Sequence, residues 1–494
     1  MKELKLLSIA FVICIAMACS SKESAPFLVE ETCPIEVPED LIASGKFKYG
    51  YVKVPEFHNK PNGRQLELAV AVFKCLGDSA THPPFVLNTG GPGLSNIDNF
   101  VPLFADAGQL FLNNRDVVII ELRGLKYSKP YLNTPEIVNL QNYLVDKHLT
   151  ADETLTLYCD SIKSAYLRFN KQGINLSAFN YKETVSDIVY VMNHLDYDTF
   201  SLFGSSAGTI VAQQLMMDYP EKLEAVMLNA VVDMNFALNG MYANTINMLE
   251  KIFDEVENNE QYASAYPNLK QRFLATLEKL NTGPVTILTK RPGTEEECRV
   301  VINGDRVSLW LFMEMYWNTQ LPLSMHKIIE GDYSELINNP RAFFPIEDFS
   351  NGLSFSSIIA GWPKADDSQL FLDSEYSGFI NGLKTLMFGP LFMDEIRKFW
   401  HVNDISEQYQ TMATNVPTLI LNGKCDHVCP YGYAEKLASQ FEHAQCFVFD
   451  GIAHSPVDYG DCGIMLIKQF IDNPYSELNG ACVQAFKAGY QLPE

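Results

Sequence analysis

Short apolar runs rich in β-branched residues alternate with amphipathic helical segments along much of this chain. The expected buried strands lie at residues 85–88, 117–120, 199–203, 225–228, 417–421 and 446–449. Helical patterns lie between them at 181–195, 206–218 and 431–441. Strands that alternate with helices form a parallel sheet covered on both faces. The sequence therefore predicts an α/β fold with a mostly parallel central sheet flanked by helices.

Two stretches depart from this alternation. Residues 49–55 and 66–73 are strand-like and are separated by Asn62-Gly63, which predicts an antiparallel hairpin. Residues 234–404 are mostly helical in pattern, with candidate helices at 243–258, 269–280 and 306–319. We interpret this stretch as a cap inserted between the core parts 33–233 and 405–494. The alternative is an independent domain without a catalytic role.

The N-terminus reads as an export signal. Residues 1–18 combine an early basic start with an apolar run too short to span a bilayer, and they end in small residues before Cys19. Ala16-Met17-Ala18-Cys19 resembles a bacterial lipobox, which implies a lipid on Cys19 and a tether over 19–32. The expectation is a lipoprotein at the periplasmic face or cell surface, held to the membrane by that lipid only. An ordinary secretory signal is the alternative.

Charge and cysteine content exclude some functions. The net charge is -23 and the pI about 4.8, so an acidic surface repels nucleic acid. Outside the signal and the lipid site, nine of the 11 cysteines remain, and export favours disulfides among them. The odd number leaves at least one thiol without an intramolecular partner. Cys425, His427 and Cys429 have no second Cys/His pair at matching spacing, which favours disulfide formation or packing over zinc.

A Gly-x-Ser-x-Gly motif occupies residues 204–208 and centres on Ser206. An expected strand precedes it and an expected helix follows, which is the context of a nucleophile elbow. Side chains at the two glycines would collide with strand or helix in so tight a turn. Ser206 is therefore the predicted nucleophile, whereas Ser205 is expected to point away.

A serine hydroxyl needs a base to take its proton. His454 follows the last expected strand, and Asp426 follows the strand before it. Both lie where parallel strands end, at the edge that also carries Ser206. His454 is the predicted base and Asp426 the acid that orients it. Asp233 and Asp450 are rival acids.

The developing oxyanion needs two backbone donors. One is expected from Ala207, directly after the nucleophile. The other is expected from the glycine-rich loop at 89–93, in which Gly91 is the candidate because Pro92 has no N–H. This chemistry uses side chains and backbone donors, so no cofactor or metal ion is expected.

These residues together resemble the tripeptidyl-aminopeptidase and proline-iminopeptidase branch of the α/β hydrolases. The resemblance rests on Gly90-Gly-Pro-Gly93, on residues 121–128, on the elbow and on the Asp426 and His454 loops, and it spans roughly 33–490. It implies the α/β-hydrolase fold and a serine exopeptidase that removes residues from peptide N-termini. The chain departs from the family at Glu121, Lys126 and Ala207, where the family usually has Asp, Gly and an aromatic residue. It also has Thr89 where proline iminopeptidases tend to have His.

Three functions follow as hypotheses. The first is an exported serine aminopeptidase whose substrate is a peptide with a free N-terminus. The second is a carboxylesterase that uses the same three residues on small esters. The third is a non-catalytic binding lipoprotein that kept the fold. A fold hosts many functions, so the peptide substrate rests on the resemblance.

Overall fold

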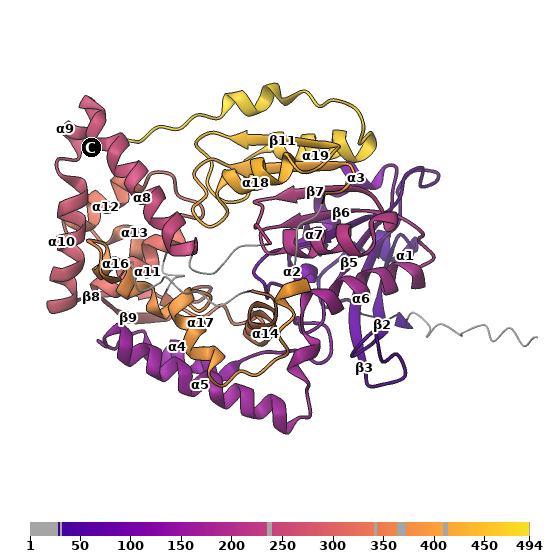
Figure 1. Cartoon of the computed structure of the whole chain (residues 1–494), viewed down its shortest axis with the longest axis horizontal. Coiled ribbons are helices and arrows are strands. Elements are labelled where there is room, and N and C mark those ends of the chain that lie inside the picture. Colours follow the sequence, from indigo (N-terminus) through magenta and orange to yellow (C-terminus); the bar gives the residue numbers. More distant parts are fainter. Residues whose placement is uncertain are drawn as a thin grey trace, which may run out of the picture.

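The computed structural model describes residues 28–29, 32–234, 240–339, 343–362, 372–408 and 413–493. Figure 1 shows two parts, a sheet-containing core and a largely helical part that faces it. The signal segment and Cys19 lie outside the described residues. None of the described helices is long and apolar enough to cross a bilayer.

The described part of the core contains a nine-stranded sheet. Its order is β1 (Leu28–Val29), β2 (Phe47–Pro55), β3 (Gln65–Phe73), β5 (Val117–Ile120), β4 (Phe85–Asn88), β6 (Phe200–Ser205), β7 (Leu223–Asn229), β10 (Thr418–Gly423) and β11 (Ala444–Phe449). β2 and β3 form the predicted antiparallel hairpin, with Phe47 opposite Phe73. From β5 to β11 all neighbours are parallel. The predicted mostly parallel sheet is confirmed.

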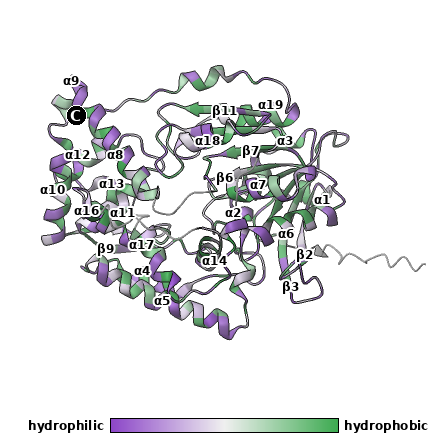
Figure 2. Cartoon of the chain, viewed as in Figure 1, coloured by the Kyte–Doolittle hydropathy of each residue, from purple (hydrophilic) through white to green (hydrophobic). Residues whose placement is uncertain are grey.

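Helices cover both faces of this sheet, because alternate residues of each strand point to opposite sides. Leu202 belongs to one apolar cluster with α6 (Tyr181–His194), α7 (Gly208–Asp218) and α18 (Tyr431–Ala438). Phe203 belongs to the other cluster with α2 (Asn96–Ala107) and α19 (Asp461–Asp472). Figure 2 shows the strands as a hydrophobic layer between helices of mixed hydropathy. The short helices α1 (Glu39–Ala43) and α3 (Gln109–Leu112) complete the described core helices.

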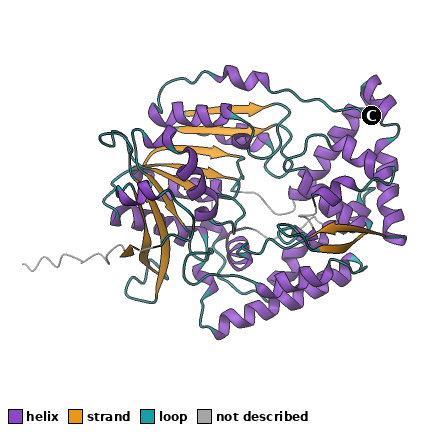
Figure 3. Ribbon diagram, turned by 180° about the vertical axis from the view of Figure 1, so that it is seen from behind, coloured by secondary structure: helices purple, strands orange, loops and turns teal. Residues whose placement is uncertain are grey.

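The chain between β7 and β10 is mostly helical, as expected. Its described elements are α8 (Gly240–Asn258), α9 (Glu260–Ala265), α10 (Leu269–Thr282), α11 (Gly304–Glu314), α12 (Leu321–Ile329), α13 (Ser334–Asn338), α14 (Asn351–Gly361), α16 (Ser377–Gly382) and α17 (Pro390–Arg397). An antiparallel hairpin of β8 (Val285–Lys290) and β9 (Glu297–Ile302), visible in Figure 3, was not foreseen from the sequence.

Two earlier helices also pack on this insert. They are α4 (Pro135–Leu144) and α5 (Ala151–Lys171). The backbone N–H of Ala151 donates to Asp305 at 3.1 Å, and the Lys384 ammonium donates to Asp152 at 2.8 Å. The helical part that faces the sheet is therefore built from two separate stretches of chain.

The C-terminal segment returns from the core to the insert, as Figure 1 shows. Its core end is fixed by a disulfide between Cys462 and Cys482. The segment then passes over Gly451, where an added Cβ would lie 2.4 Å from the Lys487 carbonyl oxygen. At its far end the Tyr490 hydroxyl donates to Glu255 at 2.7 Å. This strap links the loop before His454 to helix α8.

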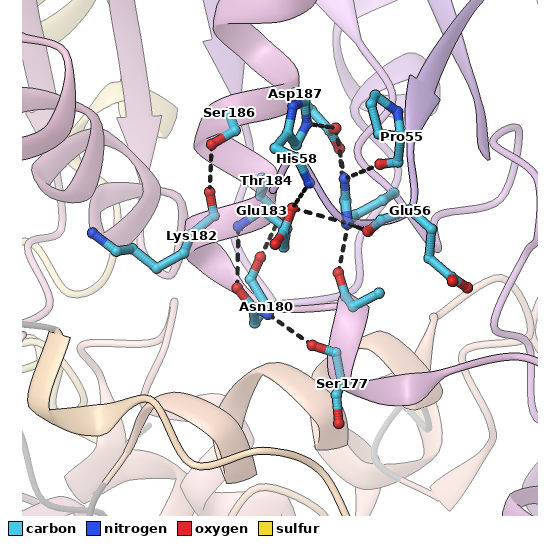
Figure 4. A network of polar contacts seen from close by, with 12 residues as sticks. Pro55, Glu56, His58, Ser177, Asn180, Lys182, Glu183, Thr184, Ser186 and Asp187 are labelled. Carbon is cyan, nitrogen blue, oxygen red and sulfur yellow. Dashed lines mark hydrogen bonds and ion pairs between the residues drawn. The ribbon is translucent and has the colours of Figure 1, made fainter. Parts of the chain in front are cut away.

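A buried ion pair holds the loop after β5 against α6. The Arg123 guanidinium donates to both carboxylate oxygens of Asp187, at 2.6 and 2.7 Å. His58 Nε2 contacts the same carboxylate at 2.8 Å, and its backbone N–H donates to Glu183 at 2.9 Å (Figure 4). Arg123 and Asp187 are almost fully buried, so each charge depends on the other for compensation.

Glu121 is fully buried in the same loop and caps the start of α2. Its carboxylate accepts from the Ile97 N–H at 3.0 Å and the Tyr127 N–H at 3.3 Å. Burial raises the pKa of Glu121 from 4.5 to about 7. The folded state therefore holds this proton more tightly than the unfolded chain does.

This shift predicts a pH dependence of stability. A rise in the pKa from 4.5 to about 7 corresponds to about 3 kcal/mol of folding free energy. This stabilisation is fully present below pH 4.5 and is lost as the pH rises to 7. Glu121→Gln cannot ionise, so we expect a smaller fall in its free energy of unfolding across that range. Urea unfolding of both proteins from pH 4.5 to 8 measures the difference. Equal slopes would contradict the assignment.

Candidate active site

Ser206 lies at a tight turn between β6 and α7. Its φ is 52°, in the left-handed region that non-glycine residues rarely adopt. A Cβ added at Gly204 would lie 2.5 Å from the Gly208 carbonyl oxygen, and one at Gly208 would lie 2.6 Å from that of Thr89. Side chains at these two positions would collide with neighbouring backbone, as predicted, because the turn leaves no room for side chains on either side of Ser206.

His454 and Asp426 form a buried pair at the ends of β11 and β10. His454 Nδ1 lies 2.7 Å from Asp426 Oδ2. Asp426 Oδ1 accepts from the backbone N–H groups of Val428 at 3.0 Å and Cys429 at 2.8 Å. The backbone N–H of His454 donates to the backbone carbonyl of Tyr316 at 2.9 Å, and the side-chain rings of the two residues meet edge to face. These contacts fix the carboxylate and the imidazole, and leave Nε2 as the ring nitrogen that does not face Asp426.

The rival acids contact other groups. Asp233 pairs with Lys436 at 2.7 Å, and Asp450 lies 3.4 Å from Lys424. His427 is fully buried against Phe312 and Tyr316, and burial lowers the pKa of His427 to about 3. It stays neutral at physiological pH. Of these acids, Asp426 is therefore the one that the fold brings to His454.

Asn229 joins the two halves of the site. Among the described residues no hydrogen bond joins the Ser206 hydroxyl to His454, and the connection runs through their neighbours. The Asn229 side-chain amide donates to the Ser205 and Ser455 hydroxyls, both at 2.9 Å. The backbone carbonyl oxygen of Asn229 accepts the Ser206 backbone N–H at 2.8 Å. Sequence reasoning missed Asn229, although its place at the end of a buried strand was a usable signal.

We expect Asn229→Ala to lower kcat by about tenfold to a hundredfold, because small displacements of reacting groups have effects of that size. The variant loses the hydrogen bonds that connect the Ser206 turn to the His454 loop. The measurement is kcat at a temperature where thermal unfolding shows both proteins to be folded. An unchanged kcat in a folded variant would contradict a positioning role.

The loop with Gly91 lies directly beside Ser206. A Cβ added at Gly90 would lie 2.7 Å from Ser206 Cβ. The loop is held by Asn96, whose Oδ1 accepts from the Thr89 N–H at 2.8 Å. Ala207 directly precedes α7, so its N–H belongs to the helix end that lacks intrahelical acceptors. The structure thus brings the loops of both expected oxyanion donors to Ser206.

The cysteines near this site do not form a disulfide. Cys425 and Cys429 are both free thiols, and Cys429 is fully buried. Asp426, Cys429 and His454 offer ligand atoms within 4.8 Å of one another. Burial raises the pKa of the Cys429 thiol well above its ordinary value, which favours the protonated thiol over the thiolate that binds metals. The group is best described as the His454–Asp426 pair with a neighbouring buried thiol.

Lys126 connects the core to the insert. Its ammonium donates to Asp98 of α2 at 3.0 Å and to Asp348 of the insert at 2.8 Å. The Tyr127 hydroxyl donates to the other oxygen of Asp98 at 2.7 Å. Lys126 and Tyr127 thus form a polar bridge between α2 and the insert.

Comparisons with known proteins find relatives of low sequence identity. The chain is similar to the serine protease Hip1 of Mycobacterium tuberculosis, with 22% identity over 465 residues that cover 87% of this chain and 85% of that protein. Among solved structures, an esterase from Exiguobacterium antarcticum matches with 13% identity and a TM-score of 0.36, covering 83% of this chain and 96% of its own. A thermophilic esterase from Thermogutta terrifontis matches with 13% identity and a TM-score of 0.38, covering 86% and 99%.

A family model decides the classification. The model described as the alpha/beta hydrolase fold matches residues 83–461, which contain Ser206, Asp426 and His454. This range begins before β4 and ends after the His454 loop, so it includes the parallel strands and the insert. The chain therefore belongs to the alpha/beta hydrolase family.

Proposed function

We propose that this protein is a serine peptidase that releases residues or short peptides from peptide N-termini, with Ser206, His454 and Asp426 as its catalytic triad. The observation that carries the proposal is the buried His454–Asp426 pair, at 2.7 Å, at the sheet edge that also presents Ser206 in a left-handed turn. A strained serine and an oriented imidazole are what nucleophilic acyl transfer requires.

In the first half of the reaction Ser206 Oγ attacks the scissile carbonyl carbon while His454 Nε2 takes the hydroxyl proton. Asp426 holds Nδ1–H and stabilises the imidazolium that forms. The carbonyl oxygen becomes an oxyanion, which the N–H groups of Gly91 and Ala207 stabilise. The intermediate collapses as the C–N bond breaks, and His454 gives its proton to the leaving amine.

In the second half a water molecule attacks the acyl-enzyme. His454 takes a proton from that water, and a second tetrahedral intermediate forms at the same donors. Its collapse breaks the ester bond to Ser206 and returns the proton to Oγ. The products are the released N-terminal fragment as a carboxylic acid and the shortened peptide as an amine.

The peptide substrate is supported by the similarity to a protein named as a serine protease, which covers 87% of this chain. A panel of aminoacyl and tripeptidyl chromogenic amides, free and N-blocked, with a short acyl ester beside them, tests it. We expect turnover of free-amine amides only. Ester turnover without amide turnover would replace the peptidase by a carboxylesterase. If no substrate is turned over and a fluorophosphonate does not label the protein, the remaining hypothesis is a non-catalytic binding lipoprotein.

We also propose that the protein is exported and anchored through a lipid on Cys19. The proposal is supported by the apolar segment that ends in Ala16-Met17-Ala18 directly before this cysteine. Metabolic labelling with a clickable palmitate analogue in a bacterial host should mark the wild type and not Cys19→Ser. Labelling of both proteins, or a wild type found only in the soluble fraction, would overturn the anchor.

A further inference from the structure

The loop at residues 89–93, which we call the oxyanion loop because it carries the proposed donor Gly91, is rich in glycine. Three of its five residues are glycines, and glycine loses more conformational freedom on folding than any other residue. Asn96 holds the first residue of the loop from within the core. An oxyanion donor has to be held in place before the reaction, so the rest of the loop needs support as well.

Two consecutive residues of the insert supply contacts at Gly93, the far end of this loop. A Cβ added at Gly93 would lie 2.8 Å from a ring atom of Phe349. The backbone N–H of Ser350 donates to the Gly93 carbonyl at 2.9 Å, and the Ser350 hydroxyl donates to the Gly124 carbonyl at 2.7 Å. Gly93 and Ser350 are both buried. The insert therefore fixes the Gly93 peptide through an apolar ring and a buried hydrogen bond.

Gly93 in turn packs against the proposed donor. A Cβ added at Gly91 would lie 2.5 Å from the backbone nitrogen of Gly93 and 3.1 Å from that of Leu94. The chain thus folds back on itself between the two glycines. Gly91 is exposed, whereas Gly93 is buried. Because closely packed groups transmit strain, a displacement of Gly93 also moves Gly91, the residue that a substrate can reach.

Asp348, directly before Phe349, makes a contact that contributes less. Its carboxylate accepts from Lys126 at 2.8 Å, but the Asp348 side chain is 60% exposed. Exposed ion pairs contribute little to stability. The Ser350 hydroxyl is buried, so its bond to the loop after β5 is stronger than the same bond would be in water. Phe349 and Ser350 are therefore the residues of this segment that hold the oxyanion loop.

We propose that Phe349 and Ser350 are positioning residues for the oxyanion donor at Gly91, so that the insert completes the oxyanion site of the core. The inference rests on the proposed function, because it requires that Gly91 and Ala207 stabilise an oxyanion. It adds that the insert acts on the chemical step, whichever acyl group the site accepts. Backbone donors contribute most where the oxyanion forms, and small displacements reduce that contribution.

The test measures kcat, KM and the Ki of a trifluoromethyl ketone that matches the best substrate of the amide and ester panel. Ser206 Oγ adds to the ketone carbonyl carbon while His454 takes its proton, and the resulting oxyanion makes the Ki report on the donors. We expect Phe349→Ala to lower kcat by about tenfold to a hundredfold, with KM within about twofold of the wild type. The Ki should rise by the same factor as kcat/KM falls.

Ser350→Ala removes one hydrogen bond and keeps the backbone N–H that reaches Gly93. We expect kcat to fall by about fivefold, in line with one lost hydrogen bond, and the Ki to rise in proportion. Phe349→Leu keeps an apolar side chain beside Gly93, so its kcat should lie between those of the wild type and Phe349→Ala. It takes the place of Phe349→Ala if thermal unfolding shows that variant to be unfolded.

Ile346→Ala and Ser308→Ala are the matched controls and should keep the wild-type kcat and Ki. Ile346 lies in the same segment with a 58% exposed side chain. The Ser308 hydroxyl is buried in the insert like that of Ser350, but it donates within its own helix, to Gly304 at 3.0 Å. All variants are compared at a temperature where thermal unfolding shows them to be folded.

An unchanged kcat in the folded Phe349 and Ser350 variants would overturn the inference and leave a hydrolase. A lower kcat without the matching rise in Ki would overturn it too, because the oxyanion site would then be intact. A rise in KM alone would make Phe349 and Ser350 substrate contacts instead of positioning residues. If the wild type turns over no member of the panel, the proposed function fails, and the inference with it.

Discussion

Ser206→Ala is expected to lower kcat by about 10⁶-fold, because removal of the nucleophile leaves only binding and oxyanion stabilisation. The fold should be unaffected, since the variant deletes one hydroxyl group from a half-buried position. The measurement is kcat on the best substrate of the amide panel, together with labelling by a fluorophosphonate probe. Labelling should disappear in the variant.

Ser205→Ala is the matched control for this prediction. Ser205 is the adjacent hydroxyl, and it accepts a hydrogen bond from Asn229. Its removal weakens one contact of the turn, so we expect kcat to fall by less than about tenfold, in line with one lost hydrogen bond. A loss in Ser205→Ala as large as that in Ser206→Ala would show that the nucleophile is not assigned correctly.

Asp426→Asn is expected to lower kcat by about 10⁴-fold, the effect of a wrong histidine tautomer in a serine triad. The reason lies in the two oxygens of Asp426. Oδ1 accepts from Val428 and Cys429, so the amide oxygen of the variant should keep that place and its NH₂ group should face His454. Nδ1 must then accept, which puts the ring proton on Nε2, where it blocks proton transfer from Ser206.

Asp233→Asn and Asp450→Asn remove the same negative charge at positions whose carboxylates pair with a lysine and not with His454. Each of these carboxylates faces a lysine. Because exposed ion pairs contribute little to stability, we expect both variants to keep kcat within about threefold of the wild type. A loss in either variant comparable to that of Asp426→Asn would reassign the acid, and equal activity of all three would remove the acid from the mechanism.

Local patterns in the sequence determined most of the sheet. The β-branched run at 117–120 and the apolar run at 85–88 became β5 and β4 with the predicted bounds. Such segments are predictable because burial on both faces demands continuous apolar side chains. The glycines of the 204–208 motif were equally informative. A Cβ at Gly204 would meet the Gly208 carbonyl within the turn, whereas a Cβ at Gly208 would meet the carbonyl of Thr89, which is distant in the sequence.

The sequence also limited the acid of the proposed triad to a few candidates, because this residue is expected directly after a strand of the sheet. Asp426, Asp233 and Asp450 all met that rule, and the sequence favoured the first of them. Their side-chain partners differ because the loops after β7, β10 and β11 fold against different neighbours. The contact between Asp426 and His454 joins residues 28 positions apart and depends on the parallel pairing of β10 with β11.

Only the tertiary structure determined the contacts between residues that are distant in the sequence. Asn229 meets Ser455 across 226 positions, and α5 meets the insert through Asp305 across 154. The C-terminal strap reaches α8 through Tyr490 and Glu255, 235 positions apart. Periodicity and turn chemistry act over a few residues, so they determine strands, helices and the Ser206 turn. The placement of Asn229 between the Ser206 turn and the His454 loop depends on how those elements pack.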